Sequence, residues 1–62
     1  MGSAACVYEL RDGSDVVATG RLSLDSVPSE GDTLRVGGRT ARVDSVAPSG
    51  GGEFHLVLQL RG

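Results

Sequence analysis

The chain of 62 residues contains no lysine and no tryptophan, and it has one cysteine, one histidine, one tyrosine and one phenylalanine. The lone Cys6 cannot form a disulfide within the chain, and His55 has no histidine or cysteine partner at a spacing typical of metal ligands. The positive charge comes from six arginines, which eight acidic residues outnumber, so the formal net charge is −2. This balance argues against strong nonspecific attraction to nucleic acid or to an anionic membrane.

Long apolar runs are also missing, and the N-terminus lacks the basic region and apolar core of a secretory signal. We therefore expect a cytoplasmic protein. The alternation described below places Cys6 inside and His55 outside a sheet, which excludes a Cys–His nucleophile pair. Because no other catalytic or ligand pattern is present, we predict no enzyme, no metal site and no cofactor.

A chain this short forms one domain at most, and its core only just outweighs the loss of chain entropy. We expect residues 1–4 to be a disordered or cloning-derived terminus and residues 5–62 to form a single small β-barrel domain. The ten glycines and the absence of a helical period favour turn-rich β structure.

The clearest pattern is a pair of alternating runs joined by Gly37-Gly38. A diglycine supplies positive φ at both central positions of a two-residue hairpin turn. The turn sets Val36 opposite Arg39, and a later loss of phase in the second run predicts a bulge near Asp44.

Three further alternating segments complete a set of five predicted strands: residues 6–10, 16–24 and 53–61. Between the first two we expect a three-residue loop over residues 12–14 that sets Leu10 opposite Val16. Gly20, on the inner face in the middle of its strand, predicts a bulge or a sharp bend. The remaining segments are predicted surface loops: residues 25–31 and 47–52.

Five strands without a helix predict an all-β fold, namely a five-stranded antiparallel meander closed into a small SH3-like barrel. The alternative is an open five-stranded sheet that buries one face in a dimer. The predicted core consists of the side chains that alternate inward: Tyr8, Leu10, Val16, Ala18, Leu22, Leu24, Leu34, Val36, Val43, Phe54, Leu56, Leu58 and Leu60.

Three valines alternate outward on strands expected to be neighbours. Val7, Val17 and Val57 predict an exposed apolar patch with His55 at its margin. A small core and a possible free edge on the last strand also favour association with itself or with a partner. Our first hypothesis is a non-catalytic protein-interaction module, or a small accessory or scaffold protein, that forms a homo-oligomer or binds a protein partner through this patch.

Arginines suggest the alternative function. Arg21, Arg35 and Arg42 alternate outward on strands expected to be adjacent, and Arg39 lies beside the diglycine turn. Such a stripe predicts contact with nucleic acid or with an acidic peptide. Against it, neighbouring acidic residues can neutralise the stripe, and no outward aromatic side chain is available to stack on bases.

Two stretches resemble known proteins. Pro28–Val46, a Pro-x-x-Gly-Asp turn followed by an alternating hairpin, is similar to a pattern in short uncharacterised bacterial and phage proteins, which implies a small bacterial β-barrel without site residues to transfer. His55–Gly62 resembles the last strand and tail of the ubiquitin family, which would imply conjugation through the terminal glycine. That family packs a helix on its sheet, and no segment here has a helical period.

Overall fold

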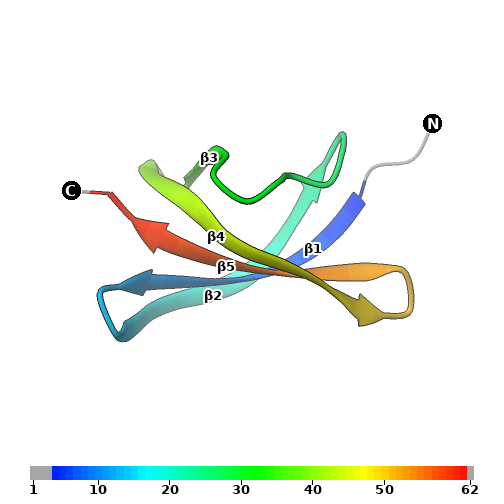
Figure 1. Cartoon of the computed structure of the whole chain (residues 1–62), viewed down its shortest axis with the longest axis horizontal. Helices are drawn as coiled ribbons and strands as arrows, with labels where there is room; N and C mark the ends of the chain where they lie inside the picture. The colour runs from blue at the N-terminus through cyan, green and yellow to red at the C-terminus, as the bar shows by residue number, and fades with distance from the viewer. Residues whose placement is uncertain (1–3, 62) are drawn as a thin grey trace.

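The computed structural model describes residues 4–61, which form five strands and no helix (Figure 1). The strands are β1 (Ala4–Asp12), β2 (Asp15–Leu24), β3 (Thr33–Val36), β4 (Arg39–Gly50) and β5 (Glu53–Leu60). The predicted all-β class is confirmed, and this part of the chain has no helix able to cross a membrane. Ala4, expected in the terminal segment, begins β1, whereas the expectation for residues 1–3 lies outside the described residues.

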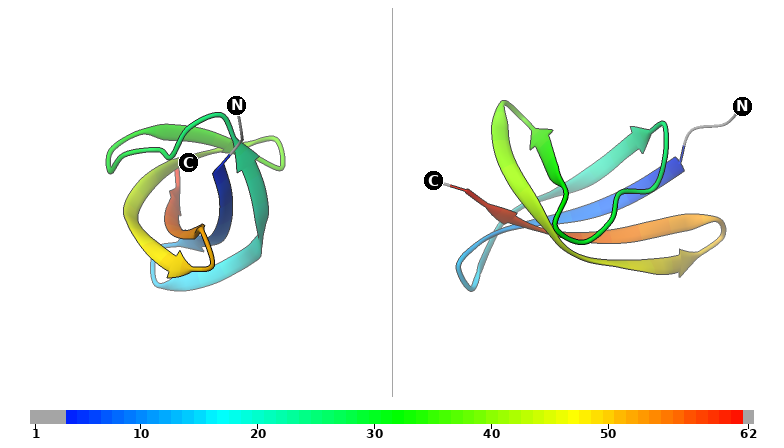
Figure 2. Two further views of the ribbon diagram at one scale, coloured as in Figure 1. Left: turned by 90° about the vertical axis from the view of Figure 1, so that its right-hand side faces the viewer. Right: turned by 45° about the horizontal axis from the view of Figure 1, so that its top comes forward.

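All five strands belong to one sheet with the order β2-β1-β5-β4-β3. β1 pairs with β5 in parallel, and the other three pairs are antiparallel. The prediction of a wholly antiparallel, closed barrel is therefore wrong. Strands alternate in direction along a meander, so the first and last of an odd number run the same way and can pair only in parallel. The sheet curls into a half-barrel that stays open between β2 and β3 (Figure 2).

The end of the connection between β2 and β3 is held to β4. The Gly31 N–H donates to the Val43 carbonyl and the Val43 N–H donates to the Asp32 carbonyl, both at 2.8 Å. Within the connection, the Ser29 N–H donates to an Asp32 carboxylate oxygen at 2.9 Å. These bonds extend the pairing of β3 with β4, while within residues 4–61 the other edge of β3 stays unpaired.

The β1–β2 hairpin differs from its predicted register. Its turn has two residues, with Asp12 opposite Asp15 and Gly13 at a φ of 67°. A bulge then shifts the register, so that Ala18 rather than Val16 lies opposite Leu10. Val16, which was predicted in the core, is 51% exposed. A tight turn followed by a bulge satisfies the alternation as well as a three-residue loop does.

Gly20 has a different role from the predicted bend. The register runs through it without a shift, and it lies directly opposite Tyr8. A Cβ atom at Gly20 would be 2.9 Å from Tyr8 Cε2 and from its Oη. The glycine therefore makes room for the aromatic ring, which covers the gap that a missing side chain would leave in the sheet.

The pairing of β3 with β4, and of β4 with β5, largely agrees with the prediction from the sequence. Val36 lies opposite Arg39 across the diglycine turn, and the register of β4 shifts between Val43 and Ser45, which confirms the predicted hairpin and bulge. The predicted loop at residues 47–52 is wrong, because β4 continues to Gly50 and pairs with β5 up to a two-residue glycine turn.

The core lies on the concave face and is centred on β5, the middle strand of the sheet. Seven side chains of residues 4–61 are buried: Cys6, Leu10, Val36, Ala41, Val43, Leu56 and Leu58. The other predicted core residues pack against them and are partly buried, with the exception of Val16. No polar or charged side chain is buried among the described residues, so packing alone holds this interior together.

We predict that Gly20→Ala lowers the free energy of unfolding by about 1–2 kcal/mol, because the added methyl group collides with the Tyr8 ring. Gly20 does not have a positive φ, so without the collision the change would stabilise the fold by about 0.4–1 kcal/mol. Denaturant titration followed by circular dichroism measures the difference. In a Tyr8→Leu background the penalty should largely vanish, and a penalty of unchanged size there would contradict this explanation.

Candidate interaction surface

The open side of the half-barrel exposes the outer edge of β2. This strand pairs with β1 along one edge, and within residues 4–61 no strand pairs with the other. The edge is ten residues long and contains neither lysine nor proline, the residues that commonly protect such edges. Its inner side chains Ala18, Leu22 and Leu24 are only half-buried. Unpaired backbone groups therefore lie beside an incompletely covered part of the core.

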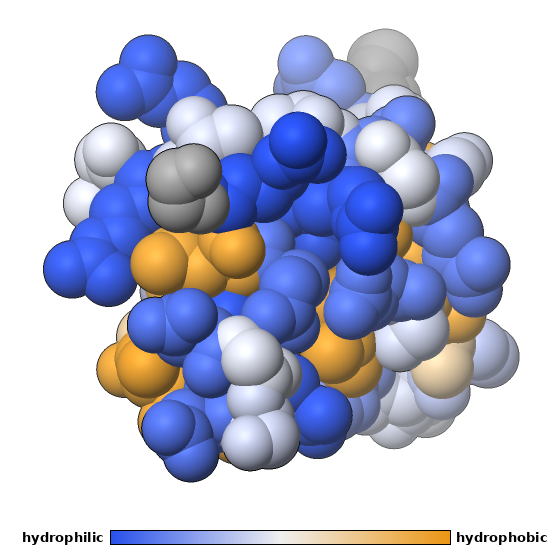
Figure 3. Space-filling model, turned by 60° about the vertical axis from the view of Figure 1, so that its left-hand side comes forward, coloured by the Kyte–Doolittle hydropathy of each residue, from blue (hydrophilic) through white to orange (hydrophobic). Residues whose placement is uncertain are grey.

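A groove of about 280 Å³ lies between β2 and the β3–β4 turn. It is lined by Tyr8, Leu10, Val17, Ala18, Val36, Gly37 and Arg39. Val17 is 48% exposed there, whereas Val16, 51% exposed, lies opposite Arg11 and faces the outer side of the sheet. Figure 3 brings this end of the molecule forward and shows apolar surface between hydrophilic side chains. The groove is thus lined by both apolar and polar surface, and the polar groups include a guanidinium and a phenol.

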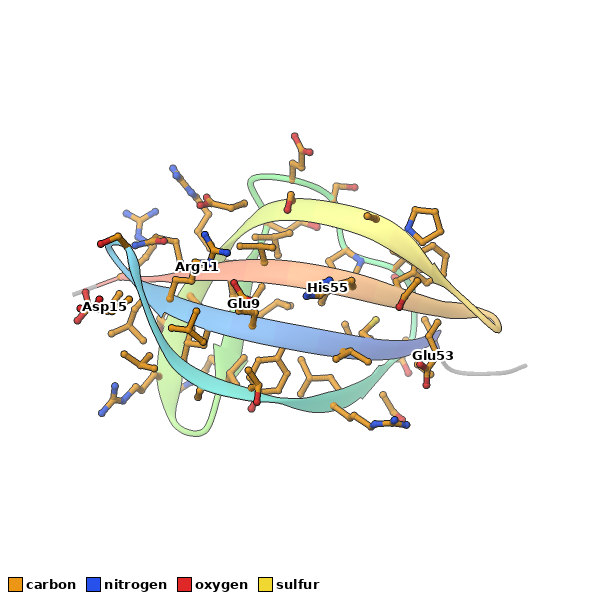
Figure 4. All side chains as sticks on the ribbon, turned by 90° about the horizontal axis from the view of Figure 1, so that it is seen from below. Glu9, Arg11, Asp15, Glu53 and His55 are labelled. Atoms are coloured by element: carbon orange, nitrogen blue, oxygen red, sulfur yellow. The ribbon has the colours of Figure 1, made fainter. Side chains whose placement is uncertain are left out.

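The predicted valine patch is only partly assembled. His55 lies on the convex outer face (Figure 4). Val7 is opposite His55 on β1, and Val57 follows two residues further along β5. The β2 neighbour of Val7 is Arg21, whereas Val17 lines the groove on the open side. The structure therefore brings Val7, His55 and Val57 together and separates Val17 from them.

Charged side chains lie between the apolar side chains of the outer face. Three ion pairs between residues that the structure describes lie on it: Glu9 with Arg11, Arg21 with Glu53 at 3.3 Å, and Arg42 with Asp44 at 3.3 Å. Exposed pairs of this kind contribute about 0–1 kcal/mol each to stability. Their main consequence is a mixed surface on which Val7 and Val57 do not form a continuous apolar area.

The four arginines of the alternative function do not form one stripe. Arg21 is on β2 and Arg35 is on β3, which are the opposite edges of the sheet, so the expectation that their strands are adjacent is wrong. Arg35 and Arg42 are on neighbouring strands, and Arg42 is paired with Asp44. Arg39 lies in the groove, on the other side of the sheet.

Sequence reasoning missed this placement of Arg39, although a signal was present. Residues directly opposite each other in an antiparallel pair point to the same side of the sheet. Arg39 is opposite Val36, whose side chain is buried on the concave side. The predicted pairing was therefore sufficient to place this arginine at the mouth of the core rather than with the outward arginines.

Cys6 and His55 lie on opposite faces of the sheet, as alternation predicts. Cys6 is 1% exposed and lies between Leu22 and Phe54 of the neighbouring strands, whereas His55 is exposed. Burial raises the pKa of the Cys6 thiol. Among residues 4–61 no three His, Cys, Asp or Glu side chains are grouped as a metal ion would require.

Comparison with protein-family models, with curated proteins and with solved structures gave no match to this chain. Gly62, the residue through which the likeness to the ubiquitin family would imply conjugation, lies outside the described residues.

We predict that Cys6 resists alkylation in the folded protein and reacts only on unfolding, because burial blocks access and keeps the thiol protonated. Iodoacetamide labelling followed by mass spectrometry should track the denaturation curve. Since the folded-state pKa is raised, the contribution of the thiol to stability is complete at neutral pH and is lost as the pH rises through the folded-state value. Rapid labelling without denaturant would contradict this prediction.

Proposed function

We propose that the chain is a non-catalytic protein-interaction module that self-associates through the open side of its half-barrel. The observation that carries this proposal is the unpaired edge of β2, ten residues long, beside half-buried apolar side chains. A strand added at this edge would satisfy backbone N–H and C=O groups and cover apolar surface in one contact. It would also bring the sheet nearer to the closed, SH3-like barrel that the sequence predicts.

The size of the core supports the need for such a contact. Among residues 4–61 only seven side chains are buried, and a chain of 62 residues buries a smaller fraction of its surface than larger domains do. Each additional Å² of covered apolar surface contributes about 25 cal/mol. Val17, which lines the groove and is 48% exposed, would be covered by a contact on the open side.

The open side is a better contact than the outer face predicted from the sequence. The outer face is convex, and its Val7 and Val57 are half-buried among side chains in ion pairs. The open side combines an unpaired edge, a groove and the exposed Val17. A second surface can pack closely against the latter combination without first breaking an existing ion pair.

We predict that the wild-type protein forms a defined oligomer and that Val17→Lys converts it to a monomer, because a lysine in the contact would place a charge against apolar side chains. The matched control is Val57→Lys, which puts the same charge on the outer face and should leave the oligomer intact. Light scattering behind a sizing column, over a range of concentrations, measures both.

The two alternatives give distinct results. A wild-type protein that is monomeric at every concentration contradicts self-association. Dissociation by Val57→Lys with no effect of Val17→Lys would assign the contact to the outer face instead. Circular dichroism of each variant confirms that the monomer is folded before its mass is interpreted.

A further inference from the structure

Charges of opposite sign lie on the two sides of the groove on the open side: an acidic rim at the β1–β2 turn, just beyond Val17, and a basic rim at Arg39. Asp12 and Asp15 lie opposite each other where the β1–β2 hairpin turns. Asp12 continues the inward row of Tyr8 and Leu10, so these carboxylates lie toward the concave side of the sheet. Arg39 lines the groove from the β4 side.

None of these three charges has a partner in the described part of the chain. The ion pairs among residues 4–61 involve other arginines and other acids, and all three side chains are exposed. Like charges directly opposite each other destabilise an antiparallel pair, so Asp12 and Asp15 favour a cation that the chain itself does not supply. Arg11, the nearest arginine in sequence, points to the outer face and is bonded to Glu9.

Apolar side chains occupy the space between the two rims. Val17, Leu10 and Val36 line the groove. From β2 across the groove to β4, the surface therefore has an acidic rim, an apolar centre and a basic rim, which is the order required for a patch that is complementary to itself. A twofold axis through the centre places each rim against the opposite rim of the second copy.

We propose that the occupant of the groove is a second copy of this chain, in an isologous contact. Arg39 of one protomer faces Asp12 and Asp15 of the other, and the valines of both protomers form the apolar centre. The twofold axis brings the free edges of the two β2 strands side by side in antiparallel directions. This inference rests on the proposed self-association and adds its symmetry and its charge pairing.

The test is a charge exchange in the full chain. Arg39→Asp places acid against acid, and Asp15→Arg places base against base, so each variant alone should dissociate at least about tenfold more readily than the wild type. In a mixture of the two variants, both contacts of a heterodimer are again complementary. Native mass spectrometry distinguishes the heterodimer by mass, and sedimentation measures the dissociation constants.

Arg35→Asp is the matched control, because Arg35 is an exposed arginine of the same hairpin opposite Thr40 and away from the groove. It changes the net charge as Arg39→Asp does and should leave the dimer intact. Arg39→Gln, a milder change, should weaken the dimer without adding a repulsion. Circular dichroism establishes that each variant is folded.

The outcomes separate this inference from the proposal on which it rests. Recovery of a heterodimer from two weakened variants supports the isologous contact. A wild-type dimer that Val17→Lys dissociates, but that Arg39→Asp and Asp15→Arg leave unchanged, overturns the charge pairing and leaves self-association standing. A wild-type monomer at all concentrations overturns both proposals and assigns the groove to a different occupant.

Discussion

The parallel pairing of β1 with β5 is the one strand pairing that joins the two halves of the sheet. β1 and β2 form one hairpin, and β3, β4 and β5 form a meander. Parallel neighbours cannot be linked by a tight turn, so the chain completes three further strands before β5 returns to β1. Through this pairing Leu10 meets Leu58, and the buried side chains of the two halves become one core.

The open side is a consequence of the same arrangement. In a closed barrel β2 would also pair with β3, but within residues 4–61 these two strands are the unpaired edges of the sheet. The buried side chains are therefore packed at the centre of the sheet, and the free edge of β2 lies at its periphery. An assembly that covers this edge would supply the protection that lysine, proline or a covering loop gives in other sheets.

Local features of the fold could be predicted from the sequence because alternation and turn chemistry are local. The hairpin at Gly37 and the bulge near Asp44 follow from them. So does most of the core: the predicted set lacks Cys6, Ala41 and a few partly buried side chains, and it wrongly includes Val16. The expected neighbours β1–β2, β1–β5 and β3–β4 are observed, but the opening between β2 and β3 could not be predicted, because no local pattern in either strand encodes whether two edge strands far along the sheet meet. The groove likewise arises from the curl of the sheet, although the side of Arg39 was implied by its pairing with Val36.

The parallel alignment of β1 and β5 also determines how the molecule would respond to tension. The chain enters at one end of the molecule through β1 and leaves at the other end through β5 (Figure 1). A pull between the two termini therefore slides these strands past each other and loads the hydrogen bonds between them together, in shear. Strands pulled apart from one end would instead lose their bonds one after another. Placed in a longer polypeptide, this small fold would act as an in-line element whose mechanical resistance is set by a single ladder at the centre of its sheet.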